Sequence, residues 1–361
     1  MYNLDVMSFE DQQLKEQNIL PEKEHVFISP NTDKETFEKG FNPREYLKTY
    51  YPIPPDLEKI LWASEIVKNQ YSRNTKIDIK DMVERLRVSS ELAENLAIFD
   101  FQRVVAKKLL QAYPQDNIEV LDVGGGPTIY QHIAMSLQAG SITHSEFLEQ
   151  NRTEVNKWVN NEEGSYNWDS YFDFIVIMLN KDEDYKRVLY EQLQGGDRET
   201  KAHAGLVKSL LEGDTENFKV YLREKLNQRV IQGDVFSSDL GLGVSKKYDV
   251  ASSGREGSVE MLTSNFTVES ATGDRKKWEQ GMKNITSKIK NRGFLALTAL
   301  RNAEWYSVGE EKMPAVKINE NDLIAILKNE GFDIIELRTL EGSDKETVGY
   351  EGMVFVFAQK S

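Results

Sequence analysis

Residues 118–131 constrain the fold of this chain more than any other stretch. Residues 120–123 form a short, mostly aliphatic run that is typical of a strand buried on both faces. Three consecutive glycines at 124–126 then allow a sharp turn in which bare backbone can approach a ligand. The apolar spacing of the next residues predicts a helix over 127–137, with the proline in its first turn. A strand, a glycine turn and a helix in this order predict half of a doubly wound α/β sheet.

Two acids make the ligand of this turn more specific. Asp122 directly precedes the glycines, where a cationic group of a ligand could lie, and Glu146 stands about 20 residues further on, where an acid binds ribose hydroxyls. A dinucleotide fingerprint needs a third glycine near the helix, and this chain has Ile129 there. The pattern suits a ligand without a pyrophosphate. We therefore expect S-adenosylmethionine rather than a nicotinamide dinucleotide.

The same stretch also carries a family resemblance. Residues 122–131, Asp-Val-Gly-Gly-Gly-Pro-Thr-Ile-Tyr-Gln, resemble a motif of the nicotinamide, phenylethanolamine and indolethylamine N-methyltransferase family. This resemblance implies a Rossmann-like, seven-stranded α/β methyltransferase sheet that uses S-adenosylmethionine and releases S-adenosylhomocysteine. It covers most of residues 41–361, with one long interruption. Three other stretches resemble the family in the same order: 41–47 with Tyr50 and Tyr51, 149–151 with 157–158 and 166–169, and 293–295 with 308–310.

The resemblance also implies which residues hold the cofactor. Gly124 and its neighbours would hold the aminobutyrate end, Glu146 would accept hydrogen bonds from the ribose, and Asp234 with Val235 would clasp the adenine. Glu146 stands where the family has an aspartate, and Phe147 stands where a tyrosine is common. The expected cofactor site comprises Tyr51, Asp122, Gly124, Gly125, Gly126, Thr128, Glu146, Phe147, Asn151, Asp234, Val235 and Ser252.

The acceptor site departs further from the family. Thr298 replaces an aspartate of the nicotinamide enzyme, so nicotinamide is not expected as the substrate. Arg255 could pair with an acceptor carboxylate and Glu256 could receive an amine, although these two side chains could equally pair with each other. The expected substrate site comprises Tyr46, Arg255, Glu256, Thr298, Asn302 and Trp305, with Tyr46, Asn302 and Tyr306 as candidate catalytic residues.

The predicted activity is methyl transfer to a small polar molecule, most readily the nitrogen of an amine. Transfer from a sulfonium needs position and a water-poor pocket more than covalent help from the protein. Two other functions stay open. One is a cyclase that converts S-adenosylmethionine itself to azetidine-2-carboxylate and methylthioadenosine. The other is a module that binds the cofactor without catalysis.

Composition excludes several classes of partner. A net charge of −14 over 361 residues argues against nucleic acid and anionic membranes, because phosphates need a basic surface. The chain has no cysteine, which excludes disulfides and thiolate metal sites and fits a reducing cytoplasm. No apolar run approaches the roughly 20 residues that span a bilayer. The four histidines lack ligand spacing, so we expect no metal, and the oligomeric state stays open.

The chain divides into three expected parts. Residues 1–40 are a polar leader, residues 41–115 a helical cap over the cofactor, and residues 116–361 the methyltransferase core. A helical insertion at 180–232 interrupts the core, and it could be a second lid, an association surface or a solvated ornament. Helices are expected at 56–62, 79–87, 91–112, 151–160, 182–194, 199–212, 216–231, 276–290 and 319–329, and strands at 141–145, 172–179, 248–253, 293–300, 334–340 and 353–358.

Overall fold

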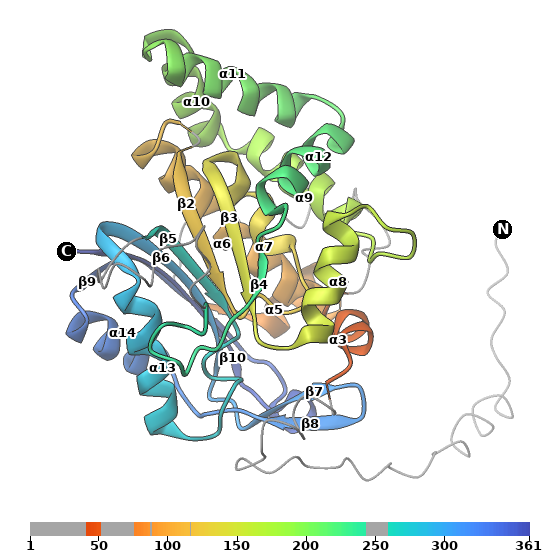
Figure 1. The fold of residues 1–361 in the computed structure, drawn as a ribbon. Helices are drawn as coiled ribbons and strands as arrows, with labels where there is room; N and C mark the ends of the chain where they lie inside the picture. The colour runs from red at the N-terminus through yellow and green to blue at the C-terminus, as the bar shows by residue number, and fades with distance from the viewer. Residues whose placement is uncertain (1–40, 52–75, 87–88, 116, 243–258) are drawn as a thin grey trace, which may run out of the picture.

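The computed structural model describes residues 41–51, 76–86, 89–115, 117–242 and 259–361. Its centre is an eight-stranded sheet in the order β1-β9-β10-β6-β5-β2-β3-β4, beside a separate hairpin, β7-β8 (Figure 1). The predicted seven-stranded sheet is present, and β1 extends it by one short edge strand. The strands are β1 (Lys76–Asp78), β2 (Ile118–Val123), β3 (Ala139–Glu146), β4 (Val230–Gln232), β5 (Val259–Asn265), β6 (Ile289–Arg301), β7 (Trp305–Val308), β8 (Glu311–Pro314), β9 (Phe332–Glu341) and β10 (Gly352–Lys360).

Strand direction gives the sheet its functional edge. β2 runs parallel to both β3 and β5, and β5 runs parallel to β6, so the carboxyl ends of these strands meet at one edge. β10 is antiparallel to both β6 and β9, which confirms the predicted antiparallel finish of the chain. Open α/β sheets bind ligands at the carboxyl ends of their parallel strands.

Alternation along the strands separates two helical layers. Phe355 and Phe357 of β10 pack in one core cluster, whereas Val354 and Val356 pack in a second cluster on the other face. The first cluster includes residues of α6 and α9, and the second includes residues of α13 and α14. The longer helices are α3 (Pro43–Tyr50), α5 (Ile79–Leu86), α6 (Ser90–Ala112), α8 (Glu149–Val159), α9 (Asp169–Lys181), α10 (Glu183–Gly195), α11 (Arg198–Glu212), α12 (Thr215–Leu226), α13 (Arg275–Ser287) and α14 (Glu320–Asn329). Two one-turn helices are α7 (Tyr130–Ile133) and α15 (Lys345–Val348).

One strand prediction is wrong, and another lies outside the described residues. Residues 172–179 lie within α9 and are helical. Almost every residue of that run is buried, because α9 packs between the sheet layer and the helices that follow it, so no polar face marks it as a helix. The predicted strand at 248–253 lies outside the described residues. The strand that pairs with β2 on the side away from β3 is β5, whose last residues are polar.

The helix after the glycine turn is shorter than predicted. α7 begins only at Tyr130, and a single turn of 3-10 helix at 135–137 follows it. The Thr128 hydroxyl and the Gln131 amide both donate to the Gly125 carbonyl oxygen, at 2.8 and 3.0 Å. These side chains hold residues 127–129 in the turn, so Pro127 precedes the helix instead of starting it.

The described residues between 41 and 115 form helices and one short strand. α5 and α6 confirm the predicted helices at 79–87 and 91–112, whereas β1 forms a strand where we expected helix. The predicted helix at 56–62 lies outside the described residues. α6 is buried along most of its length between the sheet and the insertion helices.

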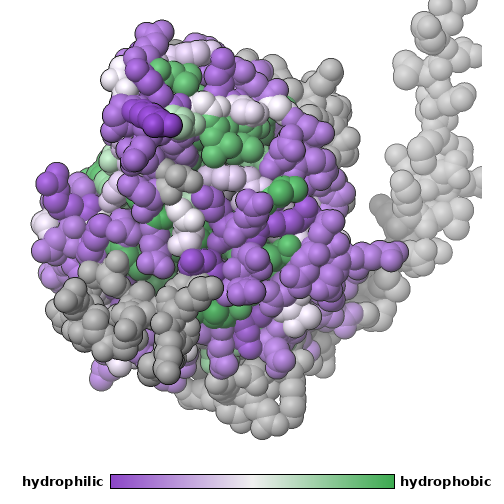
Figure 2. All heavy atoms as spheres, turned by 45° about the horizontal axis from the view of Figure 1, so that its top comes forward, coloured by the Kyte–Doolittle hydropathy of each residue, from purple (hydrophilic) through white to green (hydrophobic). Residues whose placement is uncertain are grey.

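The insertion at 180–232 consists mainly of α10, α11 and α12. These helices lie at the opposite end of the molecule from α3 and the β7-β8 hairpin (Figure 1). Their apolar side chains, including those of Leu189, Val207 and Phe218, belong to the same core cluster as α6 and α9. The face turned forward in Figure 2 is mostly hydrophilic but carries a hydrophobic patch, and Leu206 and Val220 of the insertion are 40% and 49% exposed. Among the described helices, none is long and apolar enough to cross a membrane.

Candidate active site

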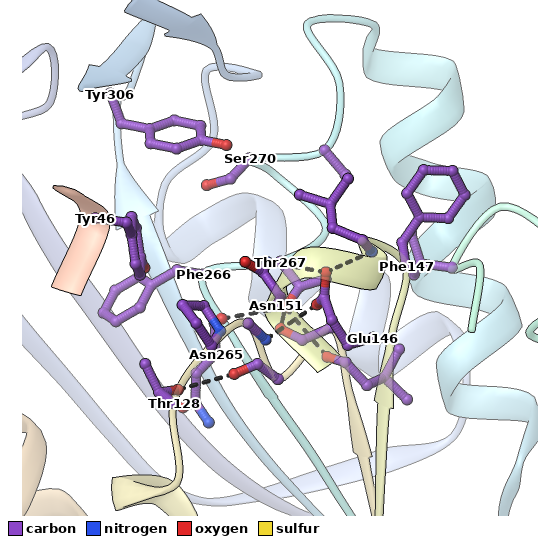
Figure 3. A pocket seen from close by; sticks show the side chains of 18 of the residues that line it. Tyr46, Thr128, Glu146, Phe147, Asn151, Asn265, Phe266, Thr267, Ser270 and Tyr306 are labelled. Atoms are coloured by element: carbon purple, nitrogen blue, oxygen red, sulfur yellow. Dashed lines mark hydrogen bonds between the residues drawn. The ribbon is translucent and has the colours of Figure 1, made fainter. Parts of the chain in front are cut away.

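One cavity of about 400 Å³ lies at the carboxyl ends of β2, β3 and β5. Loops after these strands form one end, and α3, α6 and the β7-β8 hairpin close the other (Figure 3). The cavity lies where parallel strands of open α/β sheets bind ligands. Of the expected residues, Tyr46, Tyr51, Gly124, Gly125, Gly126, Thr128, Glu146, Phe147, Asn151, Asp234, Val235 and Tyr306 line it.

The glycine turn gives the first end a bare backbone wall. The amides of Gly124 and Gly125 donate to the Ser145 carbonyl oxygen at 2.7 and 3.2 Å, which ties the turn to β3. Gly124 has a φ of +67°, and a Cβ there would lie 1.9 Å from Cγ2 of Thr267. Only glycine fits this position, so the turn keeps its backbone open to the cavity.

Glu146 organises the loop at the end of β3. Its Oε2 accepts a hydrogen bond from the Gly126 amide at 3.0 Å, and its Oε1 accepts from the Leu148 amide at 2.8 Å and from Nδ2 of Asn151 at 3.1 Å. The carboxylate therefore joins the glycine turn to the start of α8. Figure 3 shows Glu146 and Asn151 together in the wall of the cavity.

Three buried side-chain oxygens without a hydrogen-bond partner line the cavity. They are Oγ of Ser145, Oδ1 of Asn151 and Oγ of Ser270. Buried polar groups ordinarily find partners. Gly233 lies beside them, because a Cβ there would be 1.8 Å from Oγ of Ser145. These residues fit the hydroxyl and amino groups of S-adenosylmethionine.

The turn that we expect to hold the adenine follows β4. The Asp234 Oδ1 accepts a hydrogen bond from the Phe236 amide at 2.9 Å, which fixes the turn. Nδ2 of Asn284 donates to the Val235 carbonyl oxygen at 2.9 Å from the adjacent helix α13. Asp234 and Val235 thus stand in a fixed turn at the cavity wall, where the resemblance expects the adenine.

Tyrosines enclose the other end of the cavity. The ring of Tyr46 lies 5.0 Å from that of Tyr50 and 6.0 Å from that of Tyr51, centre to centre. Tyr306 reaches in from β7, and its hydroxyl points toward Ser270 (Figure 3). Burial raises the pKa of the Tyr46, Tyr50 and Tyr306 hydroxyls, so they remain protonated near neutral pH. Aromatic side chains therefore form most of the wall at this end of the cavity.

Asp122 does not contribute to the wall as expected. Its carboxylate is fully buried below the glycine turn, where it accepts hydrogen bonds from the Thr263 hydroxyl at 2.7 Å and from Nε2 of Gln131 at 3.0 Å. We expected Asp122 to contact the ligand directly. Instead, the groups that donate hydrogen bonds to its carboxylate belong to the protein interior. Asp122 supports the turn from beneath.

Three acceptor candidates also lie outside the cavity wall. Thr298 lies deeper along β6, and its carbonyl oxygen accepts from the Phe266 amide at 2.8 Å. The Asn302 amide turns away and donates to Glu351 at 2.7 Å. Trp305 precedes Tyr306 on β7, so strand alternation directs its ring to the opposite side, where Lys312 covers it. Ser252, Arg255 and Glu256 lie outside the described residues.

Several wall residues carried no sequence signal. They come from α6, from the loop after β5 and from the start of β10. For Glu94, the sequence offered one hint: an acidic residue within the largely apolar stretch that forms α6. The missed residues include Glu94, Asn95, Ile98, Asn265, Phe266, Thr267, Ser270, Tyr350 and Met353.

Two histidines that we expected to be isolated lie together. Nε2 of His132 is 3.1 Å from Nδ1 of His144 and 3.3 Å from Oδ2 of Asp122, and all three side chains are buried. The other ring nitrogen of His144 lies 3.1 Å from the Gly126 carbonyl oxygen, which can only accept a hydrogen bond. His144 therefore carries its proton on Nε2, and its Nδ1 accepts from His132. This chain of hydrogen bonds links Asp122 to the glycine turn.

Comparison with known proteins assigns the chain to a family. The phenylethanolamine N-methyltransferase of Macaca mulatta is 25% identical over 245 residues, which cover 67% of this chain and 73% of that protein. The nicotinamide N-methyltransferase of Homo sapiens is 22% identical over 338 residues, which cover 91% of this chain and 96% of that protein. Among solved structures, an S-adenosylmethionine-dependent methyltransferase from Methanosarcina mazei matches with 13% identity and a TM-score of 0.40, over 70% of this chain and 96% of that one. The model of the NNMT/PNMT/TEMT family matches residues 87–195 and 206–361, so this chain belongs to that family of S-adenosylmethionine-dependent methyltransferases.

Proposed function

We propose that this methyltransferase acts on the nitrogen of a small amine. The observation that supports the proposal is a single cavity with two chemically different ends. One end offers bare backbone, Glu146, Asn151 and Asp234 to a nucleoside and an aminobutyrate group. The other end is formed by aromatic rings and could hold a small acceptor beside the reacting methyl group.

The residues of this chain position the reactants and exclude water. S-adenosylmethionine supplies an electrophilic methyl group on a sulfonium. Glu146 and the glycine turn would hold its nucleoside half, and the tyrosines of α3 would cover the acceptor half. Alignment in a water-poor pocket accounts for most of the barrier reduction that such a displacement needs.

Product analysis tests the proposal. The protein is incubated with S-adenosylmethionine alone and then with ethanolamine, 2-phenylethylamine, glycine or pyridine, which represent four types of nitrogen acceptor. We expect S-adenosylhomocysteine and an N-methylated product only when an acceptor is present.

The other outcomes separate the alternatives. Methylthioadenosine formed without an acceptor would indicate the cyclase reaction. Binding of S-adenosylhomocysteine with no product from any acceptor would contradict amine methylation and favour the non-catalytic module. The Glu146→Ala variant is the control for activity that does not depend on this cavity.

A further inference from the structure

Glu94 is the acid at the acceptor end of the cavity. Glu94 lies on α6 and is 5% exposed, and it lines the cavity together with Tyr50, Tyr350 and Met353. The other acidic wall residues in the described part of the chain, Glu146 and Asp234, belong to the cofactor end. Among the described residues, Glu94 is therefore the one acidic side chain in the wall of the mainly aromatic acceptor end.

Neutral donors hold the Glu94 carboxyl group. The Tyr350 hydroxyl donates to its Oε2 at 2.9 Å, and the Ser343 hydroxyl donates to its Oε1 at 2.8 Å. Neither partner carries a positive charge, and among the described residues no lysine or arginine forms an ion pair with Glu94. Burial raises the pKa of Glu94 to about 7, although the two hydroxyl donors act in the opposite direction. A buried carboxyl group without a counter-ion favours the arrival of a cation.

Hydrogen bonds around Glu94 join the helix that carries it, α6, to α3 and β7. Nδ2 of Asn95 donates to the Tyr50 carbonyl oxygen at 2.9 Å, which ties α6 to the end of α3. The Tyr50 hydroxyl accepts from the Ser307 amide at 3.0 Å, which ties α3 to β7. These contacts hold Glu94, Tyr50 and the β7 strand of Tyr306 as one wall. A carboxyl group held in this way is preorganised for a ligand.

Glu269 shows that burial alone does not make such a site. Its carboxyl group is also buried, and burial raises its pKa to about 7. However, its Oε1 accepts from the Leu300 amide at 2.9 Å, and Glu269 is not part of the cavity wall. Glu269 supports the backbone, whereas Glu94 faces the space that an acceptor would occupy.

On the basis of the proposed function, we infer that Glu94 binds the acceptor amine and takes its proton before methyl transfer. The acceptor is then an alkyl amine that enters as an ammonium ion. The ammonium gives one proton to the Glu94 carboxylate and becomes a free amine. Its nitrogen lone pair forms the N–C bond as the C–S bond breaks, and that electron pair stays on sulfur. The products are neutral S-adenosylhomocysteine, a cationic N-methylammonium and a protonated Glu94, which then releases its proton to solvent.

This inference predicts which acceptors react. Ethanolamine and 2-phenylethylamine are cationic near neutral pH and would be methylated. Pyridine is neutral there and would not use Glu94. The matching alcohol, 2-phenylethanol, would not compete with 2-phenylethylamine for the site.

The test compares Glu94→Gln with wild type on whichever of the two alkyl amines reacts faster. Because the variant keeps the shape and loses the charge, KM for the amine should rise roughly 10- to 100-fold, the loss expected for a charge-assisted hydrogen bond. The acidic limb of the kcat/KM profile should move from near neutral pH toward the pKa of the amine itself, because only solvent then removes the proton. Glu94→Asp should move the limb part of the way back, and S-adenosylhomocysteine affinity should not change. Glu191→Gln, on α10 and away from the cavity, is the matched charge-loss control.

A second variant covers the case in which Glu94→Gln does not fold. Tyr350→Phe keeps the carboxyl group and removes a donor that lowers its pKa, so the acidic limb should move to higher pH. An unchanged KM and pH profile in Glu94→Gln, or an unmoved limb in Tyr350→Phe, would overturn the inference. Wild-type protein that methylates no amine would instead contradict the proposed function.

Discussion

At the scale of single residues, Glu146 joins the glycine turn to α8 at the end of the cavity where we expect the cofactor. It stands where an acid was expected to bind the ribose, and its carboxylate also accepts the amides of Gly126 and Leu148. The extra methylene relative to the family aspartate does not prevent it from bracing the glycine turn. A substitution at Glu146 should therefore affect both ligand contact and the shape of the turn.

Glu146→Ala should weaken S-adenosylhomocysteine binding by about 1–3 kcal/mol, because it leaves buried donors unpaired. Isothermal titration calorimetry measures the change. Glu149→Ala, which removes an exposed acid one turn away on α8, should bind like wild type. Equal affinities for Glu146→Ala and Glu149→Ala would show that Glu146 is not part of the cofactor site.

At the scale of elements, the predictable parts of the fold are those with strong local chemistry. The strand and glycine turn at 118–126 and the helix that begins after Asn319 carry clear signals, and β2 and α14 confirm them. Asn319 and Asp322 form a reciprocal cap, which is why the start of α14 is readable from the sequence. Such signals need only neighbouring residues.

The elements and site residues that the sequence did not predict depend on contacts with residues far away in the chain. The polar end of β5 hides its strand character, because Thr263 donates to Asp122 and Ser264 donates to the Val123 carbonyl oxygen. The cavity residues Glu94 and Tyr350 are 256 positions apart in the chain, and only the tertiary fold brings them together. Expected residues in the glycine turn could be placed from sequence, whereas the acceptor wall could not.

Helix α3 should behave as a cover that orders when ligand binds. It is held by hydrogen bonds of Tyr50 to Asn95 and Ser307, by the ion pair of Arg44 with Glu154 at 2.6 Å, and by the packing of Leu47 in the main core cluster. Product release requires such a cover to open. Hydrogen exchange across residues 41–51 should slow when S-adenosylhomocysteine is added. Unchanged exchange would indicate that α3 is only a packing element.

Tyr51→Phe tests the same element by function. The variant removes one hydrogen bond, from Tyr51 to the Tyr130 hydroxyl at 3.2 Å, and leaves the buried ring. We expect turnover to fall more than the loss of about 0.5–1.5 kcal/mol in folding stability would explain. An activity loss that merely follows the unfolded fraction would contradict a role in catalysis.

The histidine pair below the turn should give pH-dependent stability. Burial lowers the pKa of His132 from 6.5 to about 4, so the folded state binds fewer protons than the unfolded state between these values. This contribution is present above about pH 6.5 and is lost as pH falls toward 4. His132→Gln removes the titration and retains a donor for His144. Chemical unfolding should show the stability of wild type falling relative to His132→Gln over this range; a constant difference would contradict it.

At the scale of the whole molecule, we propose that the insertion at 180–232 serves as part of the main core. None of its residues lines the cavity in the described part of the chain, and α10–α12 lie at the far end from α3 (Figure 1). Its apolar side chains share one core with α6 and α9. These observations argue against a second lid and against a solvated ornament.

Phe218→Ala tests this role of the insertion. The side chain is fully buried, and its ring lies 5.4 Å from that of Phe172 on α9. Its loss should reduce the unfolding free energy of the whole protein by about 3–5 kcal/mol without changing S-adenosylhomocysteine affinity. Val220→Ala on the same helix is the control, because Val220 is 49% exposed, and should cost less than about 0.5 kcal/mol. Equal effects of the two changes would show that the insertion is not part of the main core.

We propose that the two ends of one cavity pass a methyl group from sulfur to an amine nitrogen. Mass spectrometry of products formed from S-adenosylmethionine with a deuterated methyl group and 2-phenylethylamine or ethanolamine tests it most directly. We predict an N-methylated amine that carries the intact trideuteromethyl group, together with unlabelled S-adenosylhomocysteine. Label found only in methylthioadenosine, or no transfer of label to any amine by protein that binds S-adenosylhomocysteine, would contradict it.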